Sequence, residues 1–216
     1  MTKMLIAVRV SVFALFAPVM SAMDASANVP AGVCHLGAYE MSDGSRTVVQ
    51  PSVNDDLRYR FENGVTGRLY YINDNEYESG EGWAVREPVT LRVTFGDCET
   101  GIVRFDRKGA PALTGEQIPL PVKPVSFRSN GETLYGELVL PVQRKPRAAV
   151  VLQYGGGRDS AVINNYVQYL LPLHDIAVFV FDKRGTGRSG GEFNAHIPML
   201  ADDTVAAIEA VVICRK

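Results

Sequence analysis

The sequence predicts an α/β protein, in which a small antiparallel β-rich domain precedes a β-hairpin and a β-α-β-α segment. Three observations lead to this fold class. Alternating apolar and polar residues, as in residues 89–95, are typical of half-buried antiparallel strands. The dipeptide Asn130-Gly131 indicates a tight hairpin. Two continuous apolar runs, residues 148–152 and 176–181, are typical of strands buried on both faces.

The domain boundaries follow from changes in pattern along the chain. Residues 28–110 contain several short strand-like segments and no helical pattern, so we expect the β-rich domain there. Residues 111–123 contain Pro111, Pro119 and Pro121, which favours an extended, unpaired linker. The β-hairpin and the β-α-β-α segment then occupy residues 124–216.

Two helices are expected in the last part of the chain. Residues 160–171 fit a helix with Ser160 as its N-cap, and Pro172 would end it. Residues 198–212 fit a second helix, because Pro198 suits a first helical turn. The first of these helices joins the two apolar strands, so those strands should pair in parallel.

The composition is that of a globular protein with little net charge. Of the 216 residues, 46% are hydrophobic and 21% are charged, and the net charge is −2. No run of lysines and arginines occurs, so we expect no nucleic-acid partner. The three histidines, His35, His174 and His196, lie far apart, and we expect neither a metal site nor a cofactor.

The N-terminus has the layout of a secretory signal peptide. Lys3 and Arg9 flank an apolar run at residues 10–20, and the small residues Ala25-Ser26-Ala27 offer a cleavage site. The alternative is a retained membrane anchor, but the run is shorter than the roughly 20 apolar residues of a membrane span. We therefore expect residues 1–27 to be removed, contact with the membrane only before cleavage, and a periplasmic or secreted protein.

The chain has three cysteines, at positions 34, 98 and 214. Export implies an oxidising compartment, so we predict a disulfide between Cys34 and Cys98. The alternative is a pair of buried thiols. Cys214 has no predicted partner.

A glycine-rich turn follows the first apolar run. Gly155, Gly156 and Gly157 allow the backbone to turn sharply and leave its N–H groups free to face a ligand. Backbone amides at such a position stabilise the negative charge that develops on a carbonyl oxygen during acyl transfer.

A second motif follows the second apolar run, and together the two motifs resemble those of a known family. The motif has the form D-x-R-G-x-G-x-S and consists of Asp182, Arg184, Gly185, Gly187 and Ser189. In order and spacing the two motifs resemble the N-terminal half of the α/β-hydrolase superfamily, in particular serine aminopeptidase-like and dienelactone-hydrolase-like esterases. The resemblance implies a truncated α/β-hydrolase sheet after the β-rich domain.

The same resemblance implies a site and a reaction. Gly156 or a neighbouring glycine would donate an oxyanion amide, although Tyr154 stands where histidine is more usual. The family places its nucleophile after the next strand, and this chain ends at Lys216. We therefore expect an exported serine hydrolase that acts on ester or peptide bonds, represented by a truncated and inactive chain without nucleophile, acid and histidine. Once completed, it would take a small ester or peptide substrate. The alternative is a non-catalytic exported binding protein that uses the β-rich domain.

Two further motif matches are formal only. Residues 187–191 match the G-x-S-x-G pattern, but Ser189 does not follow its strand directly, so we interpret it as a turn residue. Residues 185–190 match the dinucleotide fingerprint, but the next helix begins too late for a nucleotide site. Asp182 and Arg184 are interpreted as a structural ion pair that shapes this loop.

Overall fold

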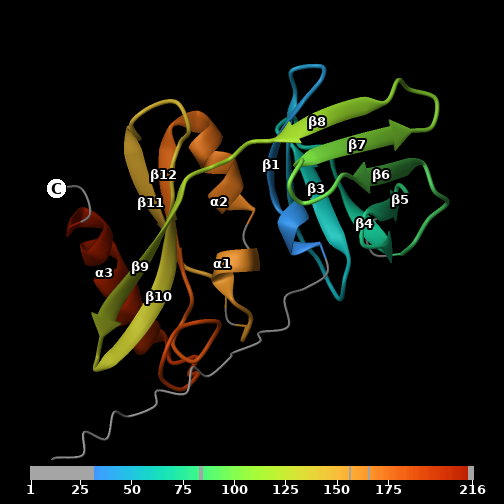
Figure 1. Cartoon of the computed structure of the whole chain (residues 1–216). Helices are drawn as coiled ribbons and strands as arrows, with labels where there is room; N and C mark the ends of the chain where they lie inside the picture. The colour runs from blue at the N-terminus through green and yellow to red at the C-terminus, as the bar shows by residue number, and fades with distance from the viewer. Residues whose placement is uncertain (1–31, 83–84, 156, 165, 214–216) are drawn as a thin grey trace, which may run out of the picture.

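The computed structural model describes residues 32–82, 85–155, 157–164 and 166–213. These residues form two bodies, a closed barrel and a four-stranded sheet with helices (Figure 1). The predicted signal peptide at residues 1–27, Gly156 and Cys214 lie outside the described residues. Within the described part of the chain, no helix is both long and apolar enough to cross a membrane.

The barrel consists of eight antiparallel strands that pair in chain order. A short 3-10 turn, η1 (Val33–His35), precedes them, and the strands are β1 (Gly37–Met41), β2 (Arg46–Pro51), β3 (Leu57–Phe61), β4 (Thr66–Asn73), β5 (Glu76–Ser79), β6 (Leu91–Phe95), β7 (Ile102–Arg107) and β8 (Leu113–Gln117). The last strand returns to the first, where Tyr39 lies opposite Gln117, and this pairing closes the barrel.

Side chains fill the inside of the barrel. The alternation of the strands directs one residue in two inward, and the inward residues are apolar and often aromatic. The ring of Tyr59 meets that of Phe105 edge to face at 5.6 Å, and Tyr77 meets Phe95 in the same way. A disulfide between Cys34 and Cys98 ties the start of the described chain to the loop after β6. The barrel is therefore a packed core with a covalent tie at one end.

The second body is a mixed sheet with the strand order β11-β12-β10-β9. Its elements are β9 (Val122–Ser129), β10 (Glu132–Val139), β11 (Ala148–Leu152), α1 (Ala161–Asn164), α2 (Val167–Leu170), the 3-10 turn η2 (Leu171–His174), β12 (Ile176–Phe181) and α3 (Ile197–Ile213). The strands β9 and β10 form the hairpin around Asn130-Gly131. The parallel pairing of β11 with β12 and the long helix near residues 198–212 are confirmed.

The predicted fold class is wrong. The described chain is mostly β, with an eight-stranded antiparallel barrel plus a second sheet, and is not a truncated α/β-hydrolase sheet. Residues 113–117, which we expected to be unpaired linker, form β8 and pair with both β1 and β7. Among the described strand pairs only β11 and β12 run in parallel. Closure of the barrel through β8 is the feature that the sequence patterns did not reveal.

Where one helix was expected at residues 160–171, the described residues form the short elements α1, α2 and η2, which lie between the sheet and the barrel (Figure 1). Tyr169 packs against the barrel core, and the Arg60 guanidinium lies 4.3 Å from the centre of the Tyr166 ring. The outer faces of β1 and β2 are buried there, with Ala38 and Val48 almost inaccessible. These short elements are thus the part of the second body that packs against the barrel.

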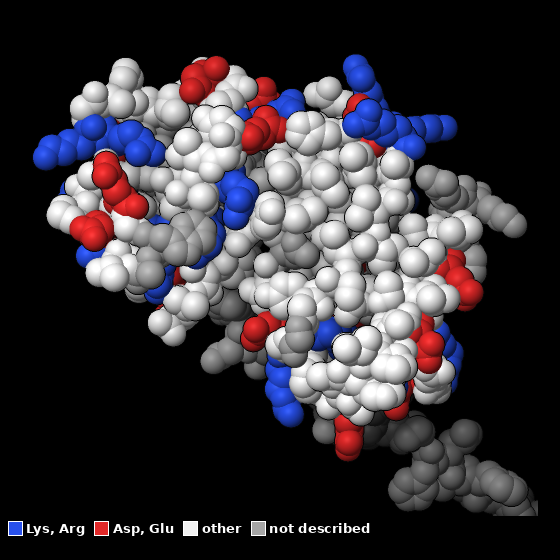
Figure 2. Space-filling model, turned by 180° about the vertical axis from the view of Figure 1, so that it is seen from behind, with Lys and Arg blue, Asp and Glu red and all other residues white. Residues whose placement is uncertain are grey.

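Charged side chains are spread over the surface. On the face shown in Figure 2, the lysines and arginines lie interspersed with aspartates and glutamates around an uncharged middle region. This distribution agrees with the low net charge of the whole chain.

One buried hydroxyl in the barrel leads to a stability prediction. Tyr77 is 1% exposed, and its hydroxyl has no hydrogen-bond partner among the described residues. Burial raises the pKa of Tyr77 to about 12. We expect Tyr77→Phe to raise the free energy of unfolding by about 1 kcal/mol at pH 7, because it removes an unsatisfied polar group. Urea unfolding would measure this change.

The pH dependence of the same variant follows from the raised pKa. The folded-state pKa lies above the ordinary value of 10.0, so the contribution of Tyr77 to stability is complete below pH 10 and is lost as the pH rises toward 12. Tyr77→Phe should therefore lose less stability than the wild type between these values. Tyr39→Phe is the control, because the Tyr39 hydroxyl donates to the His35 carbonyl at 2.8 Å and its loss should destabilise the protein. Equal destabilisation by both variants at pH 7 would contradict the prediction.

Candidate functional site

The candidate site is formed by two loops at the carboxyl ends of β11 and β12. Because these strands run in parallel, their carboxyl ends meet at the same edge of the sheet. The glycine-rich loop follows β11, and the loop that begins with Asp182 follows β12. The two motifs that are distant in sequence are thus brought side by side.

The Asp182 carboxylate joins the start of α1 to the loop after β12. This side chain is buried. One carboxylate oxygen accepts hydrogen bonds from the amides of Ala161 and Val162 at 2.8 and 3.3 Å. The same oxygen accepts the Ser160 hydroxyl at 2.7 Å, and the other oxygen accepts the Arg188 amide at 2.9 Å. Asp182 therefore caps α1 from a distance, which is the role that we had predicted for Ser160.

The Ser189 hydroxyl is fully used in backbone hydrogen bonds. It donates to the Asp182 carbonyl at 2.6 Å and accepts the Tyr135 amide at 2.9 Å. Among the described residues, no histidine side chain forms a hydrogen bond with this hydroxyl. His196 instead donates its backbone amide to the side chain of Asn194. The bonding of Ser189 is that of a structural turn residue, which leaves no activated nucleophile at this position.

The expected ion pair between Asp182 and Arg184 is wrong. Arg184 instead pairs with Asp203 on α3, with 2.6 Å between the guanidinium and a carboxylate oxygen, and both side chains are buried. This pair raises the pKa of the Arg184 guanidinium. The Asp182 carboxylate is already occupied by backbone amides, so Arg184 is directed to α3 instead.

Two glycines of the second motif are required by close approach of other atoms. Gly185 and Gly187 have φ values of 66° and 50°, which disfavour other residues. A Cβ atom at Gly187 would collide with the Asp182 carboxylate, and one at Gly185 would collide with the Phe193 backbone. Both glycines are therefore needed for the folding of the loop itself.

Lys183 is the residue of this site that the sequence patterns missed. Its side chain is 1% exposed, and its ammonium donates to the carbonyl oxygens of Gly155 and Gly157. The same nitrogen lies 5.3 Å from the centre of the Tyr154 ring and 5.7 Å from that of Phe193. In the described part of the chain it forms no ion pair, and burial lowers its pKa. The sequence does place a lysine just after the second apolar run, and a parallel partner strand leads into the glycine-rich loop. This position could have indicated that Lys183 lies beside the loop.

The contact with Lys183 fixes the orientation of the glycine-rich loop. The carbonyls of Gly155 and Gly157 face the ammonium, and the planar trans peptide then directs the Arg158 amide away from it. Within the described residues, the amides of Gly155, Gly157 and Arg158 have no hydrogen-bond acceptor. Gly155 and Gly157 are exposed. The Arg158 amide is therefore directed away from the buried ammonium of Lys183.

Among the residues that the structure describes, no group of three or more His, Cys, Asp or Glu side chains is arranged to hold a metal ion. The two loops place a buried cation and an exposed loop with unpartnered amides next to each other, while the carboxylate of Asp182 is occupied, and such a combination is compatible with the binding of an anion.

A prediction separates the structural role of Ser189 from a catalytic one. Ser189→Ala removes a hydrogen bond to the Tyr135 amide and leaves that buried donor unsatisfied, so the free energy of unfolding should fall by about 1–3 kcal/mol. Thermal or urea unfolding would measure the change. Ser126→Ala, at an exposed position on β9, is the matched control and should have little effect. An unchanged stability of Ser189→Ala would contradict the structural role.

Comparisons with known proteins give no family. No model of a known protein family matches the sequence, and no curated protein matches it. Among solved structures, a hypothetical protein from Pseudomonas aeruginosa is 22% identical over 43% of this chain and 30% of its own, with a TM-score of 0.35. An acylaminoacyl peptidase in complex with a chloromethyl ketone is 13% identical over 78% of this chain and 31% of its own, with a TM-score of 0.33.

The acylaminoacyl peptidase from Pyrococcus horikoshii is similarly distant. It is 12% identical over 79% of this chain and 44% of its own, with a TM-score of 0.33. This chain spans less than half the length of each of these proteins. The structural similarity to peptidases is therefore distant and assigns neither an activity nor a site to this chain.

Proposed function

We propose that the glycine-rich loop binds the oxyanion of an ester or peptide substrate, as in hydrolysis by acyl transfer, and that the described residues provide this binding function without turnover. The observation that carries this proposal is the buried Lys183 ammonium, which holds the carbonyls of an exposed glycine-rich loop whose described amides have no partner among the described residues. A carbonyl oxygen that becomes negative would gain from both, since fixed dipoles and charges in a desolvated site need no reorganisation during the reaction.

The electrostatic argument rests on how Lys183 is held. No carboxylate lies within ion-pair distance of this ammonium in the described part of the chain. Carbonyl oxygens and aromatic faces contact it directly, and the carboxylates of Asp159 and Asp182 act on it from beyond ion-pair distance. A buried charge without a counter-ion is costly, and it is retained in proteins mostly where a ligand or a reaction uses it. An anion bound above the loop would supply the direct ionic partner that this ammonium does not have among the described residues.

The described residues contain no complete catalytic group. The hydroxyls of Ser160 and Ser189 are both committed to hydrogen bonds with Asp182. No serine hydroxyl among them forms a hydrogen bond with a histidine ring, so the pair of nucleophile and base that acyl transfer needs is not formed there. We therefore expect this chain alone to bind an oxyanion and to turn over no substrate.

We also propose that the protein is exported to the periplasm or the exterior. The disulfide between Cys34 and Cys98 supports this localisation, because such bonds persist in oxidising compartments. The charge and apolar pattern of the first residues supports it independently.

The anion-binding loop can be tested with phenylphosphonate, a stable tetrahedral anion. Titration of the isotope-labelled chain should shift the amide resonances of Gly155, Gly157 and Arg158 in a saturable way. Lys183→Met should weaken this binding by about tenfold or more, since it removes a desolvated charge. Lys145→Met, at an exposed lysine before β11, is the matched control and should leave binding unchanged. Thermal melts of both variants would verify that they fold.

The pH dependence and the turnover provide two further readouts. Because burial lowers the pKa of Lys183 below the ordinary 10.5, phosphonate binding should weaken as the pH rises through this lowered value, where the ammonium loses its proton. Unmoved loop amides would overturn the proposal and favour the non-catalytic binding protein. Saturable hydrolysis of p-nitrophenyl acetate by the purified chain would contradict the absence of a formed nucleophile.

A further inference from the structure

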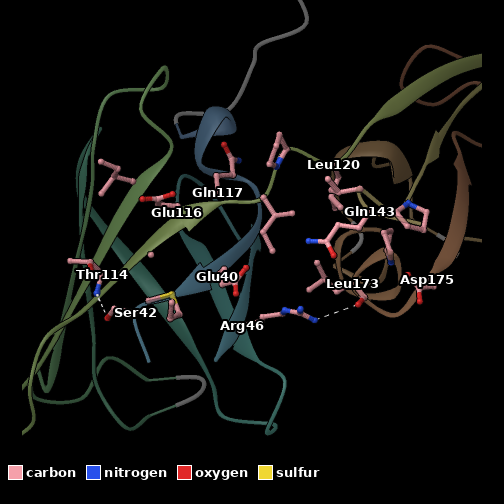
Figure 3. A pocket seen from close by; sticks show the side chains of 18 residues that line it. Glu40, Ser42, Arg46, Thr114, Glu116, Gln117, Leu120, Gln143, Leu173 and Asp175 are labelled. Carbon is pink, nitrogen blue, oxygen red and sulfur yellow. Dashed lines mark hydrogen bonds between the residues drawn. The ribbon is translucent and has the colours of Figure 1, made fainter. Parts of the chain in front are cut away.

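A cavity of about 780 Å³ lies between the barrel and the second body (Figure 3). This volume is within the usual range for small-molecule sites. One wall is the outer face of β1, β2 and β8, where Glu40 and Glu116 lie. The opposite wall is formed by the turn after β10 and by η2, where Gln143 and Leu173 lie. The cavity shares no lining residue with the glycine-rich loop.

Contacts between the two bodies close one side of this cavity. The Arg46 guanidinium reaches from β2 to the Leu173 carbonyl at 3.4 Å, as Figure 3 shows. Close by, the His174 ring lies 3.0 Å from a Glu62 carboxylate oxygen. Both walls are thus held in place by direct contacts, so the cavity is built into the packing of the two bodies.

The barrel wall carries two carboxylates that face each other across a strand pair. Glu40 on β1 lies directly opposite Glu116 on β8. Both side chains are exposed, and among the described residues neither forms an ion pair or a hydrogen bond. Like charges at directly opposite positions destabilise a sheet. The arrangement is therefore unfavourable by itself and would be relieved by a bound cation.

The remaining charges of the cavity do not neutralise this pair. The ionisable lining residues are Glu40, Glu116, Asp175 and Arg46, so three negative charges and one positive charge give a net charge of −2, which becomes −1 when Arg144, the ion-pair partner of Asp175, is included. Arg46 lies opposite Glu40 on β2, but its guanidinium is directed across the cavity to the other wall. Asp175 is already paired with Arg144 at 3.6 Å.

Apolar side chains stand beside the carboxylates. Ile102 lies opposite Glu116 on the neighbouring strand and is 46% exposed. Val142, in the other wall, is 48% exposed. Pro119 and Leu120 from the connection between the bodies complete this lining. Exposed apolar surface next to a carboxylate pair is complementary to a ligand with a hydrocarbon or aromatic part and a cationic end.

We propose that this cavity binds an organic cation, an amine attached to an apolar group, with the ammonium between Glu40 and Glu116 and the apolar part against Ile102 and Val142. The same chemistry is offered by a free amine and by a lysine side chain of a peptide. The two sources differ in size and are separated in the test. This binding is independent of the proposed oxyanion loop.

The test is calorimetric titration of the full chain with 2-phenylethylamine, which is cationic at pH 7, and with its uncharged isostere 2-phenylethanol. The amine should bind in a saturable way and at least about tenfold more tightly than the alcohol, because one charge-assisted hydrogen bond accounts for a difference in affinity of about this size. A third titration uses a short lysine-containing peptide whose N-terminus is acetylated and whose lysine side-chain amine is free. Tighter binding of this peptide than of the free amine would identify a peptide as the ligand. Added salt should weaken the binding of either cation.

Two variants give the sharpest test. Glu116→Gln should weaken amine binding by about tenfold and raise the melting temperature of the free protein, because it removes a like-charge contact without breaking an ion pair. Glu99→Gln, at an exposed acidic residue of the barrel outside the cavity, is the matched control and should change neither quantity. Equal affinities of amine and alcohol, or equal effects of the two variants on affinity, would overturn the proposal.

Discussion

The buried carboxylate of Asp182 is the interaction on which the second body depends. A buried charge is tolerated only when its hydrogen-bonding capacity is satisfied, and here four donors meet its two oxygens. Its own backbone adds two further links, from its amide to the Tyr135 carbonyl at 2.9 Å and from the Ser189 hydroxyl to its carbonyl. The start of α1, the loop after β12 and the strand β10 are therefore joined at one residue.

The two residues that follow Asp182 extend this arrangement to the rest of the body. Lys183 contacts the carbonyls of the glycine-rich loop, and Arg184 pairs with Asp203 on α3. Three consecutive charged side chains at the end of β12 thus hold three different elements. The Asp182 carboxylate is satisfied by backbone amides and a hydroxyl, whereas the Lys183 ammonium forms no ion pair among the described residues, and for this reason the proposed oxyanion site is built on Lys183.

The parts of the fold that could be predicted from the sequence are those specified by local signals. The hairpin follows from Asn130-Gly131, whose φ values of 45° and 85° both require residues that tolerate the left-handed region. The parallel pair follows from two apolar runs that need burial on both faces.

The barrel and the interior of the site depend on long-range contacts and could not be predicted in this way. Barrel closure requires β8, a five-residue strand within a proline-rich segment, to pair with β1 more than seventy positions earlier, where Tyr39 meets Gln117. The packing of Tyr169 against the barrel core joins residues that are far apart in the chain. The contact of Lys183 with the glycine-rich loop likewise exists only after β11 and β12 have paired.

Amide hydrogen exchange in two variants of Asp182 tests the central claim most directly. Asp182→Asn keeps an oxygen that can accept the Ala161 and Val162 amides but replaces the acceptor of the Arg188 amide, so protection should fall at Arg188 and persist at the start of α1. Asp182→Ala removes both acceptors and should lower protection at all three amides. Unchanged protection of Val162 and Arg188 in Asp182→Ala would contradict the claim that this carboxylate holds the second body together.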